Sequence, residues 1–170
     1  MTVPTAAALQ APAAAGQGVR VEFHIRKDRF SHTLFLVDGE ARQPLLVSCE
    51  GTEDEVAPPS PPFVELHQQG DIVFLTGATT VAHWSMSVEA VENRLVFDIA
   101  CRWKGEVTRL GSEYLVLDTE YRRALEFGLE KAATHEMVDD LLRIAPAAGK
   151  PATTATTIQW QYTIASKACQ

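Results

Sequence analysis

The sequence predicts a mainly β protein, either an antiparallel β-barrel or a two-sheet sandwich of about eight strands. Its clearest support is a strict alternation of apolar and polar residues at both ends of the folded region. Val19, Val21, Phe23 and Ile25 alternate with Arg20, Glu22, His24 and Arg26, and Ile158, Trp160, Tyr162 and Ile164 alternate with polar residues. Successive side chains of a strand point to opposite faces, so both segments are expected to be half-buried strands.

The length of 170 residues and a hydrophobic content of 46% are sufficient for one buried core. We expect a single domain over residues 19–166, preceded by a flexible Ala- and Pro-rich tail over residues 1–18. That tail lacks the basic and strongly apolar regions of a secretory signal. No apolar run reaches the roughly 18 residues of a membrane-spanning helix, so we expect a soluble protein.

The strands are expected in the order in which apolar runs and turn residues alternate along the chain. A hairpin of residues 19–27 and 31–38 is followed by strands at 44–50, 63–67 and 72–76, a longer hairpin of 80–91 and 94–103, and strands at 113–117 and 157–164. The proline-rich arm, Val56 to Phe63, contains the run PPSPP, which excludes a central strand. It is expected to pack on its own sheet edge or to dock on a partner.

A helical segment is predicted over about residues 119–144, before the returning C-terminal strand. Asp118 or Thr119 can cap it, and the residues that follow are rich in Glu, Arg, Leu and Ala. Gly128 leaves open whether the segment forms one helix or two, and Pro146 ends it.

The composition excludes several classes of function. A net charge of -7 opposes binding to nucleic acid and to anionic membranes. The three cysteines, Cys49, Cys101 and Cys169, form no CxxC pair, which favours free thiols in a reducing, cytoplasmic location. The chain has no phosphate-binding loop, no GxGxxG and no GxSxG, so no cofactor is indicated.

The most promising site is the polar face of the alternating strands. We expect a small polar or sugar-like ligand to bind in a barrel mouth or on a concave sheet face. The predicted ligand-binding residues are His24, Arg26, His83, Ser85, Glu89 and Trp103, with Trp160 as a second aromatic wall. The alternative is that these polar side chains only meet water, as the outer face of an antiparallel sheet normally does.

Two other functions remain open. One is an interaction or assembly domain that binds a partner or forms a homo-oligomer, and it predicts an exposed apolar patch. The other is a sugar-modifying enzyme that uses a His/Glu pair, either His24 with Glu22 or His83 with Glu89. No metal site is predicted, because His24, His32, His67, His83 and His135 show no ligand spacing, although a site built from distant strands by His24, His32 and His67 is conceivable.

Overall fold

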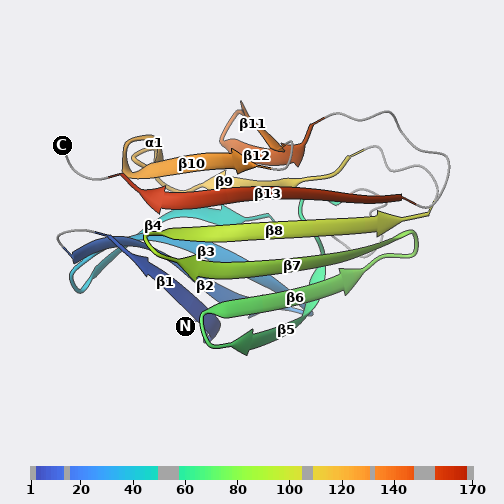
Figure 1. The fold of residues 1–170 in the computed structure, drawn as a ribbon, viewed down its shortest axis with the longest axis horizontal. Helices are drawn as coiled ribbons and strands as arrows, with labels where there is room; N and C mark the ends of the chain where they lie inside the picture. The colour runs from blue at the N-terminus through green and yellow to red at the C-terminus, as the bar shows by residue number, and fades with distance from the viewer. Residues whose placement is uncertain are drawn as a thin grey trace.

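The computed structural model describes residues 3–13, 16–49, 58–104, 109–130, 133–147 and 156–167. These residues form two antiparallel sheets that pack face to face (Figure 1). Sheet A has seven strands in the order β1-β2-β3-β4-β9-β12-β11, and sheet B has six in the order β10-β13-β8-β7-β6-β5. Neither sheet closes on itself within the described residues, so the protein is a sandwich and not a barrel.

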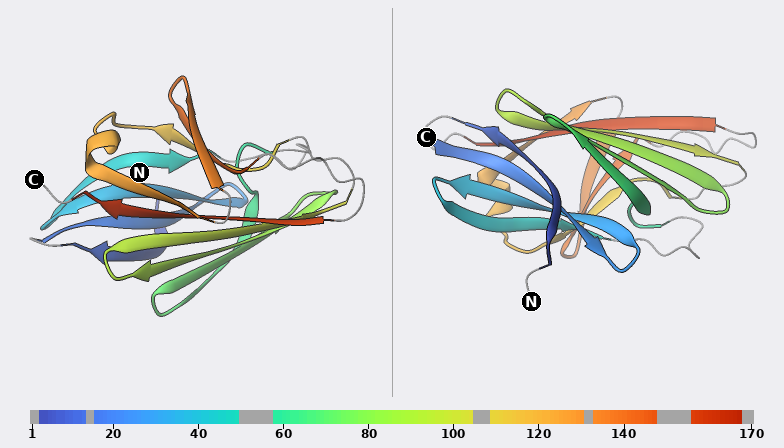
Figure 2. Two further views of the ribbon diagram at one scale, coloured as in Figure 1. Left: turned by 45° about the horizontal axis from the view of Figure 1, so that its top comes forward. Right: turned by 90° about the horizontal axis from the view of Figure 1, so that it is seen from below.

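The strands of sheet A are β1 (Thr5–Pro12), β2 (Gln17–Arg26), β3 (Arg29–Asp38), β4 (Ala41–Ser48), β9 (Ser112–Val116), β12 (Leu141–Pro146) and β11 (Ala133–Val138). Those of sheet B are β10 (Leu125–Glu130), β13 (Thr156–Ser166), β8 (Arg94–Trp103), β7 (Ala82–Val91), β6 (Ile72–Ala78) and β5 (Phe63–Gln69). The mainly β fold class is therefore confirmed, and each strand predicted from the alternation is present. Seen from below, the two sheets form two layers (Figure 2, right).

The N-terminal segment differs from the expected tail, because Thr5–Pro12 forms β1 at the edge of sheet A. Ala7, Leu9 and Ala11 alternate toward the core and pair with Phe23, Val21 and Val19 of β2. Composition alone hides this strand, since its inward residues are mostly alanines that carry little hydrophobic signal.

The predicted helical segment over about 119–144 is wrong in its extent. Among the described residues of this segment, Tyr121–Ala124 is the one stretch that forms a helix, α1, and those after it form β10, β11 and β12. β10 pairs with β13, and β12 pairs with β9, so each extends an existing sheet. Helix propensity is a weak preference of a few tenths of a kcal/mol per residue, and the hydrogen bonds and burial offered by two open sheet edges override it.

The core lies between the sheets and takes side chains from both. Val19, Val21 and Phe23 of sheet A meet Trp84, Phe97 and Ile99 of sheet B in one apolar cluster. The described part of the proline-rich arm packs against this core, because Pro58, Pro61, Pro62 and Phe63 are all buried. The chain crosses here from sheet A to sheet B (Figure 1). In the described part of the chain, no helix has the length and apolar character needed to cross a membrane.

Candidate functional site

A narrow pocket opens at the end of the sandwich where the chain crosses between the sheets. Its polar lining consists of Arg29, His32, Ser48, Cys49, Ser60 and Ser112, and its apolar lining of Phe30, Pro61, Phe63 and Met86. The lining comes from β3, the end of β4, the proline-rich arm, β7 and β9. The space inside has room for roughly one water-sized group, so only the tip of a ligand can enter it.

His32 forms the inner wall of this pocket, and its side chain points into the core. On β3, Phe30, His32 and Leu34 face inward, while Ser31 and Thr33 pair with the outward residues His24 and Glu22 of β2. The His32 backbone N–H donates to Ser48 Oγ at 2.9 Å. His32 as a whole residue is only 6% exposed. A histidine buried to this degree is normally uncharged, because burial disfavours the protonated imidazole.

A chain of hydrogen bonds leads from His32 across the core to the opposite sheet. His32 Nε2 lies 2.8 Å from the Tyr114 hydroxyl, which in turn lies 2.6 Å from the Tyr162 hydroxyl. Tyr114 belongs to β9 of sheet A and Tyr162 to β13 of sheet B, so this hydrogen bond joins the two layers. We call His32, Tyr114 and Tyr162 the buried relay.

Burial keeps all three members of the buried relay uncharged. It lowers the pKa of His32 to about 3 and raises the pKa of Tyr162 to about 12. Burial also raises the pKa of Tyr114 well above its usual value, and the neighbouring Tyr162 adds to that effect. A neutral imidazole has one donor and one acceptor nitrogen, and Tyr114 already engages Nε2. The nitrogen left for a ligand is therefore Nδ1.

Aromatic rings enclose the buried relay and hold it in place. The His32 ring centroid lies 5.5 Å from that of Phe23 and 5.8 Å from that of Phe97. Phe97 stacks on Tyr162 with centroids 4.9 Å apart and planes within 6°. Because these rings exclude water on the inner side, the hydrogen bonds of the relay lie in a medium of low dielectric constant, where an unsatisfied partner is costly.

The proline-rich arm forms the opposite wall and is fixed to β9 by Ser60. The Ser60 hydroxyl donates to the Glu113 carbonyl oxygen at 3.1 Å and accepts from the Glu113 backbone N–H at 2.9 Å. On the other side, Gly77 of β6 lies directly against the Pro62 carbonyl, with no space for a Cβ atom. The described part of the arm therefore contacts β9 of sheet A and β6 of sheet B.

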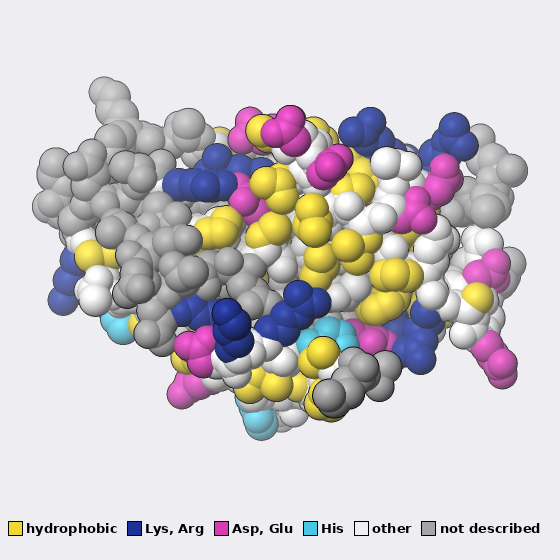
Figure 3. All heavy atoms as spheres, turned by 180° about the vertical axis from the view of Figure 1, so that it is seen from behind, with side chains coloured by type: hydrophobic (Ala, Val, Ile, Leu, Met, Phe, Trp, Pro, Cys, Tyr) yellow, Lys and Arg dark blue, Asp and Glu magenta, His cyan; other side chains and the backbone are white. Residues whose placement is uncertain are grey.

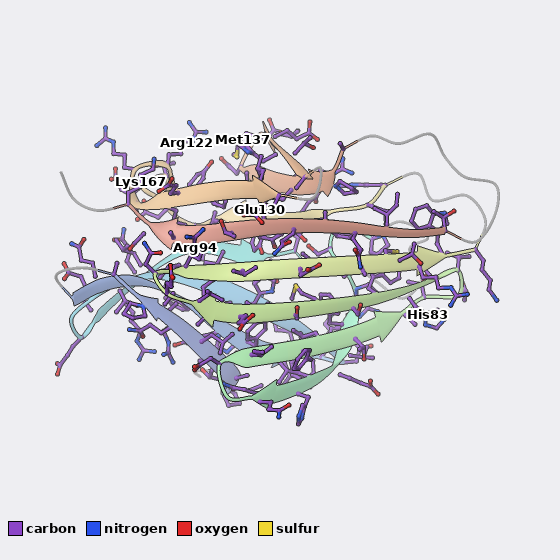
Figure 4. The ribbon with its side chains drawn as sticks, in the orientation of Figure 1. His83, Arg94, Arg122, Glu130, Met137 and Lys167 are labelled. Atoms are coloured by element: carbon purple, nitrogen blue, oxygen red, sulfur yellow. The ribbon has the colours of Figure 1, made fainter. Side chains whose placement is uncertain are left out.

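The predicted ligand-binding residues do not converge on one site. His24 and Arg26 lie on the outer face of sheet A, whereas His83, Ser85 and Glu89 lie on the outer face of sheet B. Figure 4 shows His83 near one end of β7 on the face toward the viewer. These two groups are on opposite sides of the sandwich. Trp103 and Trp160 are in the core, 4% and 0% exposed, so neither lines a pocket mouth.

The predicted Glu22–His24 pair does form, but as part of a charged cluster. His24 Nε2 lies 3.9 Å from Glu22 Oε2, and Glu22 Oε1 accepts from Arg20 at 2.6 Å and from Arg42 at 2.5 Å. Burial on its own raises the pKa of Glu22, but the hydrogen bonds and charges of Arg20 and Arg42 outweigh it, and the pKa is lowered. A carboxylate stabilised in this way is a weak general base.

The other candidate pair and the conceivable histidine site are separated by the fold. His83 and Glu89 are six residues apart on β7, which corresponds to about 20 Å along a strand. His24 lies on the outer face of sheet A, His32 in the core and His67 on β5 of sheet B. Among the residues that the structure describes, no three His, Cys, Asp or Glu side chains gather as a metal site requires.

Tyr114 and Tyr162 are the residues that sequence reasoning missed. Both occupy inward positions of alternating strands, where a tyrosine is as good a core residue as a phenylalanine. The available signal was a polar atom at each of these inward positions, together with the inward His32. Buried hydroxyls need partners, so three such residues on strands of the same core predict a shared network.

The comparisons with known proteins give no assignment. No protein-family model, no curated protein and no solved structure matches this chain.

Proposed function

We propose that the protein binds a small polar ligand, such as a polyol or a hydroxy acid, at the pocket in the end of the sandwich. The observation that supports this function is the convergence of Arg29, His32 and Ser48 on one narrow opening that apolar side chains otherwise line. Binding sites of this kind combine an apolar wall with a few polar groups that fix the orientation of the ligand. A reducing, cytoplasmic location fits this proposal, since the two described cysteines, Cys49 and Cys101, form no disulfide.

The pocket dimensions define how such a ligand would bind. One oxygen of the ligand enters the pocket and forms a hydrogen bond with His32 Nδ1, as acceptor or donor. The same oxygen accepts a hydrogen bond from the Ser48 hydroxyl, because Ser48 Oγ accepts from the His32 backbone N–H and its own proton remains available. The rest of the ligand stays outside, against the mouth residues. Arg29 lies in the pocket wall, is 5% exposed and forms an ion pair with Asp28, with Arg29 Nε 3.6 Å from Asp28 Oδ1. Its guanidinium makes the pocket more favourable for a carboxylate or a hydroxyl with partial negative charge than for a cation.

The enzyme alternative has less support. Its requirement was a histidine and a carboxylate that converge in a cleft, and the only such pair predicted that comes together is Glu22 with His24 on the outer face of sheet A. The Glu22 carboxylate there is already satisfied by two arginines. Binding without catalysis is the function we propose.

A ligand screen by nuclear magnetic resonance tests this proposal. We expect polyols or small hydroxy acids to shift the amide resonances of His32, Ser48 and Ser112, and Ser48→Ala to weaken the binding by about fivefold to twentyfold, the value of one hydrogen bond. Ser85→Ala is the matched control, because it makes the same change on the exposed outer face of sheet B. Shifts confined to residues around Ser85, or equal effects of both variants, would contradict the proposed site.

A further inference from the structure

The buried relay connects back to the pocket at its far end. His32, its first member, lines the pocket, and so does Ser112 of β9. The Ser112 side chain forms a hydrogen bond with the Tyr162 hydroxyl, the last member of the relay. Ser112 and Tyr114 are two residues apart on β9, so both side chains face the core, where they are 4% and 0% exposed. We call His32, Tyr114, Tyr162 and Ser112 the extended relay.

The protons of the extended relay can be counted. Burial keeps the imidazole and both phenols uncharged, because it lowers the pKa of His32 and raises the pKa of Tyr114 and of Tyr162. A neutral imidazole carries one N–H and each hydroxyl carries one O–H, so each of the four residues supplies one proton. The three hydrogen bonds that join the four residues use one proton each. One proton is therefore left to point into the pocket.

This remaining proton lies at one end of the extended relay or at the other. If it is on His32 Nδ1, Tyr114 donates to Nε2, Tyr162 donates to Tyr114, and Ser112 donates to Tyr162, which leaves a lone pair of Ser112 Oγ for the pocket. If the His32 proton is on Nε2, every bond reverses, and the Ser112 hydroxyl proton points into the pocket while Nδ1 is the acceptor. In both states the extended relay presents one donor and one acceptor to a ligand.

Any other arrangement disrupts a buried hydrogen bond. Two donors facing the pocket would leave one of the three bonds without a proton, and two acceptors would leave a phenol proton outside these bonds. Such losses are costly in the core, where few other partners exist. On the outer face of sheet A, by contrast, charged side chains of both signs meet solvent (Figure 3), and water can replace a partner that is lost there.

We propose that the extended relay makes the pocket selective for a hydroxyl group over a carboxylate or an ammonium group. This inference rests on the function proposed above, the binding of a ligand at this pocket. A hydroxyl both donates and accepts, so it fits between His32 and Ser112 in either state and closes the extended relay into a ring. A carboxylate only accepts, and an ammonium group only donates. The space for roughly one water-sized group also suits a single hydroxyl.

The inference defines how a hydroxy acid binds and gives Tyr162 a role. The hydroxyl of the acid enters the pocket, and its carboxylate stays outside. Tyr162 does not line the pocket, and it acts through Ser112 and Tyr114, so it is a positioning residue. Its hydroxyl couples the proton of Ser112 to the proton of His32.

Four small acids that share one carboxylate test the selectivity. Glycolate carries a hydroxyl beside it, methoxyacetate an ether oxygen that cannot donate, glycine an ammonium group, and acetate none of these. We expect titrations of the full-length protein, followed by the amide resonances of His32, Ser48 and Ser112, to show glycolate binding at least about tenfold more tightly than the other three. Equal affinities of glycolate and methoxyacetate or glycine at these resonances would overturn the inference.

Tyr162→Phe separates the proton count from the fit of the ligand. Without the Tyr162 hydroxyl, Ser112 and His32 Nδ1 can both donate into the pocket, so an oxygen that only accepts is no longer disfavoured. The preference for glycolate over methoxyacetate should therefore fall below about threefold, although no residue of the pocket lining has changed. Tyr121→Phe is the matched control and should keep the preference, since the Tyr121 hydroxyl contacts Met137 and Arg122.

The outcomes distinguish this inference from the function on which it rests. Circular dichroism checks that each variant is folded, and Ser112→Ala replaces Tyr162→Phe if the latter is not, because it removes the second end of the extended relay and should lower the same preference. Glycolate binding with an unchanged preference in the folded variant would overturn the inference alone. A native protein that binds none of the four acids and no glycerol would overturn the proposed function and the inference with it.

Discussion

Two histidines of the same hairpin have opposite environments. His24 on β2 and His32 on β3 are separated by one step of the register, since His24 pairs with Ser31 and His32 with Phe23. His24 lies on the outer face of sheet A beside the Glu22 cluster, whereas His32 lies in the core within the buried relay. One step along a strand exchanges the faces of the sheet, and this alone decides whether a histidine meets carboxylates and water or aromatic rings.

The difference also shows how the two polar groups are stabilised. The Glu22 cluster uses charge, since two arginines stabilise one carboxylate at a partly exposed position. The buried relay uses only neutral hydrogen bonds, and burial keeps its members uncharged. Neutral partners suit the core because an unpaired charge there would have to lose its hydration without replacement.

Acidification should affect the buried relay and the Glu22 cluster over different pH ranges, and it should cause the largest change in the free energy of unfolding. The pKa of His32 is lowered to about 3 in the folded protein, whereas an imidazole in the unfolded chain has its ordinary pKa of 6.5. Below pH 6.5 the unfolded chain therefore takes up a proton that the folded chain does not. The contribution of neutral, buried His32 to the free energy of unfolding is complete above pH 6.5 and is lost as the pH falls toward 3. The free energy of unfolding should therefore decrease by about 1.4 kcal/mol per pH unit over this window.

Glu22 contributes in a different window, which makes the comparison measurable. Its pKa is lowered from 4.5, so its contribution is present above that pH and is lost only as the pH falls further. Urea unfolding between pH 6.5 and 4.5 thus reports on His32. The slope should flatten in His32→Phe and remain in His24→Ala, and an unchanged slope in His32→Phe would show that His32 is not the group that titrates.

The outcome for the sequence predictions follows from the same alternation. It placed Glu22 beside His24 correctly, because residues two apart on a strand share a face. It could not bring His32 to Tyr114, 82 residues away, because that contact depends on the order of strands in sheet A. The helix prediction for the segment after Tyr121 was wrong for a related reason. β10 and β12 form strands because they pair with β13 and β9, and a local pattern does not show which distant strands are available as partners.

Removing one hydroxyl from the buried relay tests its role in joining the sheets. Tyr162→Phe keeps the stacking on Phe97 but removes the partner of the Tyr114 hydroxyl on the opposite sheet. We expect the free energy of unfolding to fall by roughly 1–2 kcal/mol, the cost of a lost buried hydrogen bond. Denaturant unfolding measures this change, and Tyr121→Phe is the control, since the Tyr121 hydroxyl contacts Met137 and Arg122 instead. Equal losses in both variants would mean that the Tyr114–Tyr162 bond has no special role.

The smallest effect is expected for His24→Ala. His24 lies at the rim of the Glu22 cluster, 3.9 Å from a carboxylate that Arg20 and Arg42 already satisfy, and its other contact is a 3.4 Å approach to the Pro4 carbonyl. Removing one distant member of an ion cluster near the surface should change the free energy of unfolding by less than about 0.5 kcal/mol. A loss comparable with that of Tyr162→Phe would mean that His24, like His32, holds a part of the fold in place, and that the register does not separate the two histidines as their environments indicate.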